Sequence, residues 1–189
     1  MGFVSWRGTD RSRLARGGLA LAAGLLLCSA PAAGQESASS EPEPVSLLVS
    51  LSERSLSVLR GDETLYRFPV GVGSGSRLSR GGGVEWTFAT PTGEFEIGRK
   101  KQDPVWYAPD WHYVERGLPI PPAYSEVRYR PGVLGDYALY ISDEIAIHGT
   151  EDESTVGRAS SHGCLRMRNA DIAMMFPLVE VGTRVVIVP

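Results

Sequence analysis

The chain has 189 residues and a formal net charge of −3, and 42% of its residues are hydrophobic. This length allows one domain with its own hydrophobic core and little beyond it. The slightly acidic balance argues against nucleic-acid binding, which requires clustered Lys and Arg side chains, so we expect no nucleic-acid partner.

Residues 1–33 have the pattern of a secretory signal peptide. Four arginines precede the apolar run LALAAGLLLCSA (19–30), and the small residues APAAGQ follow it. Ala30-Pro31-Ala32 has the A-x-A form of a signal-peptidase site. The apolar run is shorter than the roughly 18 residues that a membrane span needs. We therefore expect an exported protein with no transmembrane segment in the mature chain.

The two cysteines of the chain have different expected fates. Cys28 ends the apolar run, where a cysteine can be the lipidated first residue of a lipoprotein. Leu27 precedes it where lipoprotein signals usually have a small residue, so we expect Cys28 to be removed with the signal rather than to anchor a lipid. Cys164 is then alone in the mature chain. A leftover thiol in a secreted protein indicates either intermolecular pairing or a reactive function.

Residues 34–45, rich in Ser, Glu and Pro, are predicted to be a flexible linker, and a single domain is expected at 46–189. Short runs of Val, Leu and aromatic residues with a period of two predict the first strands of that domain. They cover residues 46–52, 55–61 and 64–73, which are expected to form a meander. The glycine-rich stretch 73–83 is predicted to be a flexible loop, and it lacks the Lys-Ser/Thr of a phosphate-binding loop.

In the middle of the chain, residues 87–98 predict a turn that enters a strand, with Gly93 free to take a positive φ. Residues 103–132 contain six prolines and show no period. Long irregular segments of this kind are often lids or binding loops. A plain surface loop whose aromatic side chains cover the core is the alternative, and the sequence leaves both open.

The C-terminal part predicts two strands, 137–142 and 144–149, and a buried last strand at 183–188. Between them, residues 169–179 have the helical signature of the chain, with Asn169 as N-cap and Pro177 limiting the helix. The sum is a mainly β domain with one short helix near the C-terminus.

A candidate nucleophile and base lie in the last strands and turn. The thiolate of a cysteine is the nucleophile, so Cys164 needs a group that takes its proton. His148 ends the strand EIAIHG, where alternation places Ala146 and His148 on one face, and a base on a strand end is held rigidly. We expect a thiolate–imidazolium pair of Cys164 and His148, with His162 shaping the site or polarising the substrate.

The residues around Cys164 suit acyl transfer. The backbone N–H groups of Gly163 and Cys164 are predicted to face a developing oxyanion. Arg166 and Arg168 would suit a substrate carboxylate, although ordinary surface charge or a salt bridge is an alternative for both.

The motifs IAIHGT (145–150) and SSHGCLRMRN (160–169) resemble the signature of the L,D-transpeptidases of the YkuD/ErfK type. The resemblance covers most of the mature chain, including the opening strand pair, ATPTGEFEIG, the proline-rich insert and VGTRVVIV. It implies a mainly β fold of the L,D-transpeptidase type, a β-sandwich or barrel with one short helix near the C-terminus.

The resemblance also implies an activity. Cys164 would attack a peptidoglycan stem tetrapeptide at the carbonyl of the third residue's L-centre, expel D-Ala and form a thioester. An amine from a second stem, or from a wall-anchored protein, would then resolve the thioester. His148 would be the base, and Ser161, His162, Gly163, Gly149 and Arg166 would surround the substrate and oxyanion. Such an enzyme needs no cofactor and no metal, and it works in the periplasm. Asn replaces Arg166 in some members, which weakens a carboxylate-binding role for that arginine.

Three other functions stay open at the level of sequence. Water in place of the amine would make the protein an L,D-carboxypeptidase or hydrolase. A zinc site formed by the histidines and Cys164 is a second alternative, although His-x-Cys in a glycine turn is not a usual ligand pair. A non-catalytic wall-binding module with the same fold is the third.

Overall fold

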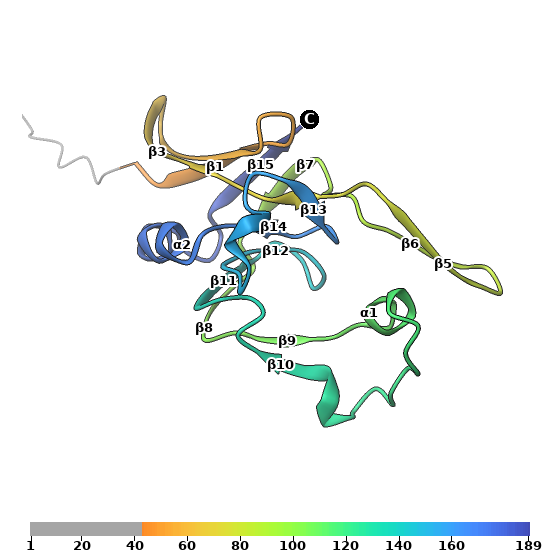
Figure 1. Cartoon of the computed structure of the whole chain (residues 1–189). Helices are drawn as coiled ribbons and strands as arrows, with labels where there is room; N and C mark the ends of the chain where they lie inside the picture. Colours follow the sequence, from red (N-terminus) through yellow and green to blue (C-terminus); the bar gives the residue numbers. More distant parts are fainter. Residues whose placement is uncertain (1–42) are drawn as a thin grey trace, which may run out of the picture. The chain divides into compact units, whose positions relative to one another are not determined.

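The computed structural model describes residues 43–189, and the expected signal peptide and most of the expected linker lie outside these residues. Figure 1 shows that the described part of the chain begins and ends at one five-stranded sheet, in which the last strand lies beside the first. The sheet has the order β3-β2-β1-β15-β7. Its strands are β1 (Val45–Ser50), β2 (Ser55–Arg60), β3 (Glu63–Pro69), β7 (Gly93–Glu96) and β15 (Arg184–Val188).

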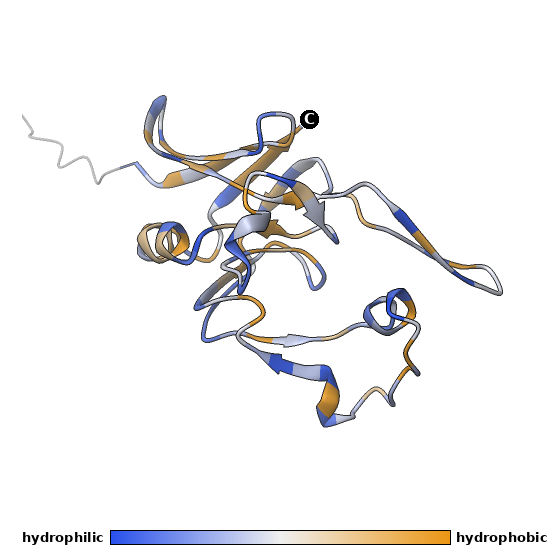
Figure 2. Cartoon of the chain, viewed as in Figure 1, coloured by the Kyte–Doolittle hydropathy of each residue, from blue (hydrophilic) through white to orange (hydrophobic). Residues whose placement is uncertain are grey.

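The predicted meander of three strands and the predicted last strand are confirmed by this sheet. β1 pairs antiparallel with β2 and β2 with β3, while β15 runs parallel to β1. Figure 2 shows β15 as a largely hydrophobic strand, as expected for a strand with a neighbour on each side and a buried face. The predicted positive φ of Gly93 is also confirmed, at 132°.

A second sheet of four strands, in the order β14-β12-β11-β8, positions the candidate catalytic residues. Its strands are β8 (Arg99–Gln102), β11 (Tyr137–Tyr140), β12 (Ala146–His148) and β14 (Leu165–Arg166). Leu139 pairs with Ile147, and Ile147 with Leu165. These three side chains lie on one face and are fully buried. His148 therefore lies on the opposite face, as the alternation predicts.

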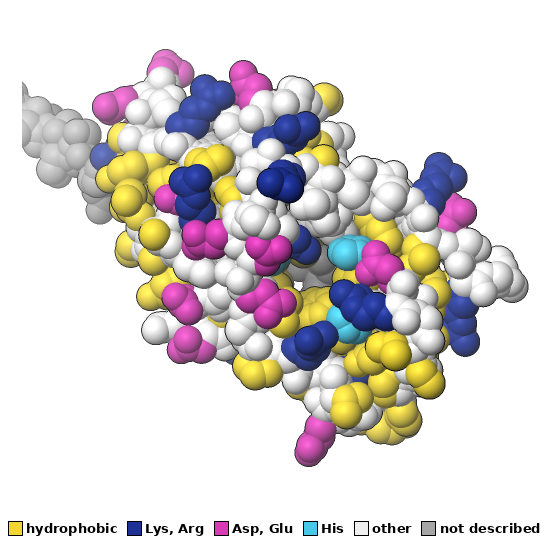
Figure 3. Space-filling view, in the orientation of Figure 1, with side chains coloured by type: hydrophobic (Ala, Val, Ile, Leu, Met, Phe, Trp, Pro, Cys, Tyr) yellow, Lys and Arg dark blue, Asp and Glu magenta, His cyan; other side chains and the backbone are white. Residues whose placement is uncertain are grey.

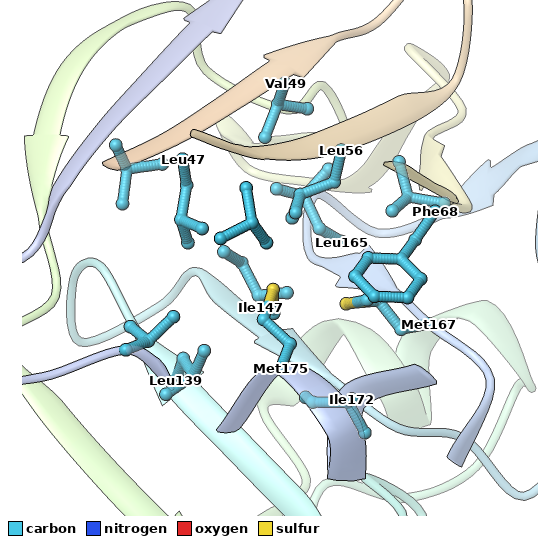
Figure 4. Packing of buried hydrophobic residues seen from close by; sticks show 14 of the residues in the cluster. Leu47, Val49, Leu56, Phe68, Leu139, Ile147, Leu165, Met167, Ile172 and Met175 are labelled. Carbon is cyan, nitrogen blue, oxygen red and sulfur yellow. The ribbon is translucent and has the colours of Figure 1, made fainter. Parts of the chain in front are cut away.

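The hydrophobic core lies between the two sheets and is closed by the helix α2 (Asn169–Met175). Figure 4 shows Leu47, Val49 and Leu56 of the first sheet facing Ile147 and Leu165 of the second. Met175 of α2 fills the space beneath Ile147. Because both sheets and the helix contribute fully buried side chains, the core holds the strands that carry the candidate site rigidly in place.

The predicted helix is confirmed, but Asn169 is not its N-cap. Arg168 occupies the cap position, and Asn169 is the first residue of α2. The Asn169 amide instead accepts a hydrogen bond from the Thr150 N–H at 3.1 Å and donates one to the Thr150 carbonyl at 2.9 Å. The side chain is thus used to hold the segment that follows His148. After α2 a 3-10 turn, η3 (Phe176–Leu178), contains Pro177 and ends the helical segment.

The glycine-rich stretch after residue 73 is a hairpin rather than the predicted flexible loop. β5 (Arg77–Gly81) pairs with β6 (Val84–Thr87), and the two project from the body of the domain in Figure 1. Gly81, Gly82 and Gly83 all have positive φ, which lets the chain reverse tightly. Glycines that resemble a flexible loop in sequence therefore make a turn between paired strands.

Residues 103–132, which we call the insert, are also more regular than predicted. They contain β9 (Val105–Tyr107), the helix α1 (Asp110–Glu115), a 3-10 turn η1 (Glu126–Arg128) and β10 (Tyr129–Pro131), which pairs with β9. Arg128 organises the insert from inside. Its buried guanidinium donates to the carbonyls of Ala108, Pro121 and Pro122 and pairs with Asp110 at 2.7 Å. The sequence does not reveal this order, because the hydrogen bonds of Arg128 go to loop carbonyls and leave no periodic pattern of residues.

The remaining short elements connect the turn that contains Cys164 to the segment that follows β3 of the first sheet. β4 (Val72–Gly73) pairs parallel with β13 (Ala159–Ser161), and η2 (Glu153–Thr155) precedes β13. Within residues 43–189, no helix is long and apolar enough to cross a membrane.

Candidate active site

Cys164 lies in a turn between β13 and β14, and the side chain of Ser161 holds that turn together. Ser161 Oγ donates to the Cys164 carbonyl at 2.6 Å and accepts from the Gly163 N–H at 3.1 Å. Gly163 has φ 123°, which favours glycine. The Gly163 N–H is therefore already engaged, so the prediction that it points at an oxyanion is wrong for this resting structure.

A second support of the turn comes from Thr90, which sequence reasoning missed. Its Oγ1 donates to the Gly163 carbonyl at 2.8 Å and accepts from the Gly73 N–H at 2.8 Å. The Thr90 side chain is buried, and its bond to the Gly163 carbonyl is shielded from water, while its bond with the Gly73 N–H is half-buried. The only sequence signal was the motif ATPTG, in which we assigned a role to Gly93 and none to Thr90.

His148 is buried, with 4% of its surface exposed, and its ring is oriented by its own neighbour. Its Nδ1 is hydrogen-bonded to the Gly149 carbonyl, which can only accept, so Nδ1 carries the proton and Nε2 has the free lone pair. Gly149, predicted to contact substrate, thus acts on the base through its carbonyl. A Cβ at Gly149 would collide with the Asn169 side chain. The two hydrogen bonds between the Asn169 amide and the Thr150 backbone therefore require glycine at position 149.

The register of the second sheet brings Cys164 and His148 to the same face. Ile147 pairs with Leu165 and His148 with Arg166, so the continued register sets Cys164 beside Ala146, two residues before His148. The thiol Sγ donates to the Glu144 carbonyl at 3.5 Å. Residues 18 and more apart in the sequence meet here because parallel pairing aligns β12 with β14.

The electrostatics of this pair differ from the prediction of a thiolate and an imidazolium. Burial raises the pKa of the Cys164 thiol, and hydrogen bonding from Ala146 and the charge of Arg166 offset this only in part. Burial also lowers the pKa of His148 to about 4, and the Arg166 charge adds to the effect. Both shifts favour a neutral thiol and a neutral imidazole at rest, since neither the half-buried Cys164 nor the buried His148 finds a full countercharge.

His162 does shape the site, and the insert holds it. Its ring stacks on Trp111 with centroids 4.0 Å apart and an interplanar angle of 13°, and it meets the edge of Phe88 at 4.4 Å. Its Nε2 lies 3.0 Å from Glu115 Oε1. Sequence reasoning missed Trp111, Glu115 and Phe88 because they are far from His162 in the chain. Trp111 and Glu115 lie on α1, and Phe88 directly follows β6.

The structure separates the two candidate arginines. Arg166 is half-buried beside His148 and forms no ion pair with any residue in 43–189. Its charge lowers the pKa of both His148 and Cys164. Arg168 is exposed at the start of α2. Arg166 therefore belongs to the site, whereas Arg168 is an exposed residue at the N-terminal cap of α2.

Figure 3 shows a hollow on this face of the molecule, with histidine side chains and both basic and acidic side chains at its rim. Among the described residues, no three His, Cys, Asp or Glu side chains are grouped so that they could hold a metal ion. The histidines considered as zinc ligands have other partners: Gly149 for His148, Glu115 for His162 and Arg130 for His112. The arrangement suits a thiol nucleophile with an adjacent base.

Comparison with known sequences agrees with this geometry. The family model of the L,D-transpeptidase catalytic domain, YkuD, matches residues 44–187. The probable L,D-transpeptidase YbiS of Escherichia coli strain K12 is 36% identical over 129 residues, which are 67% of this chain and 38% of that protein. The probable L,D-transpeptidase ErfK/SrfK of Salmonella typhimurium is 34% identical over 131 residues, covering 68% and 38%. The chain thus spans about two fifths of the length of these relatives.

Solved structures show the same fold at lower identity. An L,D-transpeptidase from Xylanimonas cellulosilytica superposes with a TM-score of 0.56 and 18% identity, covering 79% of this chain and 62% of that one. An L,D-transpeptidase from Mycobacterium smegmatis gives a TM-score of 0.55 at 19% identity, covering 77% and 59%. The mainly β fold implied by the motifs is confirmed. With a family model that spans its whole described domain and a thiol–imidazole pair on one face of its second sheet, this chain belongs to the L,D-transpeptidase catalytic-domain family.

Proposed function

We propose that this protein is a cysteine-dependent L,D-transpeptidase that acts on the stem tetrapeptides of peptidoglycan. The observation that carries the proposal is the alignment of β12 with β14, which sets the Cys164 thiol and the His148 imidazole on the same face. The hydrogen bond to the Gly149 carbonyl leaves His148 Nε2 as the proton acceptor. A nucleophile with an oriented base is what acyl transfer requires.

The neutral resting pair defines the first chemical step. As Sγ attacks the carbonyl carbon at the L-centre of the third residue, its proton passes to His148 Nε2, so charge develops only when the substrate is present. The tetrahedral intermediate collapses, the C–N bond to D-Ala breaks, and the imidazolium returns the proton to the leaving amine. The product is a thioester on Cys164 and free D-Ala.

The second half-reaction reverses these roles. An amine from a second stem, or from a wall-anchored protein, attacks the thioester carbonyl and gives its proton to His148. The C–S bond breaks, and Cys164 recovers the proton as the thiol. Nucleophile, base and leaving-group acid are all protein groups, so we propose that the reaction needs no cofactor.

The oxyanion needs a donor other than the one expected at Gly163. Ser161 engages the Gly163 N–H at 3.1 Å, so we assign the oxyanion to the backbone N–H of Cys164 itself. Ser161 and Thr90 act indirectly, since they fix the turn that aims this N–H. A fixed backbone donor typically contributes several kcal/mol to transition-state stabilisation.

The half-buried Arg166 is the guanidinium of the site that is available to a substrate carboxylate. The stem peptide carries free carboxylates, which a guanidinium binds through two parallel hydrogen bonds. We further propose that residues 46–189 are the catalytic domain and that the preceding segment directs export to the periplasm, where the substrate lies.

Mass spectrometry of muropeptides tests the proposed function. The purified protein and its Cys164→Ala variant are incubated with disaccharide tetrapeptide. Dimers joined through two third-position residues, formed by the wild type and not by the variant, are the expected result. Tripeptide alone would show that water is the acceptor and that the protein is an L,D-carboxypeptidase. Unchanged tetrapeptide with the wild type would contradict the proposal.

A further inference from the structure

The orientation of the His148 ring depends on one peptide group, which joins Gly149 to Thr150. The carbonyl of this group, on Gly149, is the hydrogen-bond partner of His148 Nδ1. Its N–H, on Thr150, donates to the side-chain oxygen of Asn169 at 3.1 Å. A peptide group is planar, so a contact that fixes the direction of its N–H also fixes the direction of its carbonyl. The Asn169 amide therefore sets the acceptor that holds the base.

The backbone pairing of the second sheet ends one peptide group earlier. β12 ends at His148, whose carbonyl accepts from the Met167 N–H at 2.8 Å. The Gly149 N–H, the other half of that earlier group, donates to the Tyr137 carbonyl at 3.1 Å. In the described part of the chain, the partners of the next peptide group are two side chains, those of His148 and Asn169. Because Gly149 lacks a Cβ, the chain can rotate there unless such a contact prevents it.

The Asn169 amide takes the place of a neighbouring strand. Its oxygen accepts from the Thr150 N–H, and its nitrogen donates to the Thr150 carbonyl at 2.9 Å. These are the two bonds that a paired residue of an antiparallel strand would make. The backbone of Asn169 is itself held, because this residue begins α2 and its N–H donates to Glu153 Oε1 at 3.0 Å. The amide thus connects the helix to the peptide group beside the base.

Two glycines make room for this amide. A Cβ at Gly149, or at Gly135 with its φ of 66°, would collide with the Asn169 side-chain oxygen. The Cβ at Gly135 would also lie 2.8 Å from the Thr150 nitrogen. The segment after β12, the segment before β11 and the start of α2 are therefore packed around one hydrogen-bonded amide. Such close packing leaves the peptide group little space in which to turn.

We propose that Asn169 is a positioning residue for the general base, because it keeps the His148 proton on Nδ1 and the lone pair on Nε2. The inference rests on the proposed function and deepens it, since it names a residue that holds the base in its reactive form. The protonated ring nitrogen of a histidine is set by the hydrogen bond of the other nitrogen. If the Gly149 carbonyl turned away, the buried Nδ1–H would lose its acceptor. A ring protonated on Nε2 instead could not take the proton of the Cys164 thiol.

Nuclear magnetic resonance of protein labelled with ¹⁵N-histidine reads the protonated nitrogen directly. The chain has three histidines, and His148→Gln assigns the signals of His148. We expect the wild type at pH 7 to carry the His148 proton on Nδ1. Asn169→Leu, which has a side chain of similar size without polar atoms, should move part of the population to the Nε2–H form. It should lower kcat for D-Ala release about 10- to 100-fold, the usual effect of removing the partner that orients a functional histidine. KM should change less than about twofold, because Asn169 acts through the base and not on the substrate.

A conservative variant and a matched control separate positioning from stability. Asn169→Asp keeps an oxygen that accepts from the Thr150 N–H but loses the donor to the Thr150 carbonyl. It should therefore retain the Nδ1–H form of His148 and lose less of kcat than Asn169→Leu. Ala170→Gly changes the next residue of α2, which is exposed, and weakens the helix through its backbone entropy. This control should lower stability while the His148 tautomer and kcat stay as in the wild type.

An unchanged tautomer in Asn169→Leu, whatever its kcat, would overturn the inference, as would a wild-type His148 protonated on Nε2 or an equal tautomer change in Ala170→Gly. If the larger leucine prevents folding, Asn169→Ala removes the amide without adding volume and gives the same reading. A wild type that releases no D-Ala would instead overturn the proposed function. The resonance measurement needs no substrate, so it decides the role of Asn169 in either case.

Discussion

The carboxylate of Glu115, on α1 of the insert, lies 3.0 Å from the Nε2 of His162, two residues before the candidate nucleophile. The carboxylate can only accept, so Nε2 carries a proton. Together with the stack of Trp111 on the same ring, this contact joins the insert to the turn that holds Cys164. The insert is therefore not a surface loop remote from the site: its helix α1 packs against the turn that holds Cys164.

Loss of this contact should loosen the insert without unfolding the domain. The Glu115 side chain is 39% exposed, so its hydrogen bond to His162 contributes at most about 1 kcal/mol, whereas Trp111→Ala removes the aromatic stack on the same ring. We expect faster amide hydrogen exchange in residues 108–116 and a lower kcat/KM, in the order Trp111→Ala, Glu115→Ala, Glu115→Gln, because Gln keeps an acceptor oxygen. Glu126→Gln, an exposed acid of the insert, serves as control. Unchanged exchange in Trp111→Ala would show that the contact does not hold α1.

Thr90→Val should both destabilise the protein and slow the reaction. The substitution keeps the shape of the side chain but removes the hydrogen-bond partner of the buried Gly163 carbonyl and of the half-buried Gly73 N–H. Unsatisfied buried groups cost about 1–3 kcal/mol each, so we expect a fall of roughly 2–4 kcal/mol in the free energy of unfolding by urea. Thr87→Val, at an exposed position of β6, should stay within about 0.5 kcal/mol of the wild type. Equal stability of the two variants would contradict the role assigned to Thr90.

The buried imidazole of His148 predicts a loss of stability in mild acid. Its folded-state pKa, about 4, is below the ordinary value of 6.5, so the unfolded chain takes up a proton before the folded one does. The contribution is complete above about pH 6.5 and is lost as the pH falls toward 4, with a total of about 3 kcal/mol at 1.36 kcal/mol per pKa unit.

Urea unfolding at pH 7.5, 5.5 and 4.5 measures this effect. The difference in stability between the wild type and His148→Gln should shrink as the pH falls, since Gln does not titrate. His112, whose pKa burial also lowers to about 4, adds a loss in the same direction, so His112→Gln is a useful second comparison. Parallel stability curves for the wild type and His148→Gln would show that the pKa of His148 is not lowered in the folded protein.

The raised pKa of Cys164 predicts a slow reaction with alkylating agents at neutral pH. A free cysteine thiol has a pKa of about 8.5, and burial of Cys164 moves its pKa upward. We expect the iodoacetamide rate at pH 7 to be below that of free cysteine and to rise up to and beyond pH 9. Arg166→Gln should lower the rate further, because it removes a cation that favours the thiolate. A plateau below pH 7 would instead establish a preformed thiolate–imidazolium pair.

Alternation along EIAIHG and the motif around Cys164 were enough to identify His148 and Cys164 and the side of the sheet on which His148 lies. The strands at both ends of the chain and the late helix followed from local periodicity in the same way. These features depend on neighbours within a few residues, so the sequence displays them directly.

Contacts between distant segments decided the rest. Thr90, Trp111 and Glu115 reach the site only after folding, and no spacing along the chain marks them. Burial, which no local motif reports, raises the pKa of Cys164 and lowers that of His148, and so favours the neutral forms over the predicted thiolate–imidazolium pair. The sequence by itself determined which groups can react, the Cys164 thiol and the His148 imidazole. The tertiary structure decided which side chains hold them in place and which protonation states their surroundings favour.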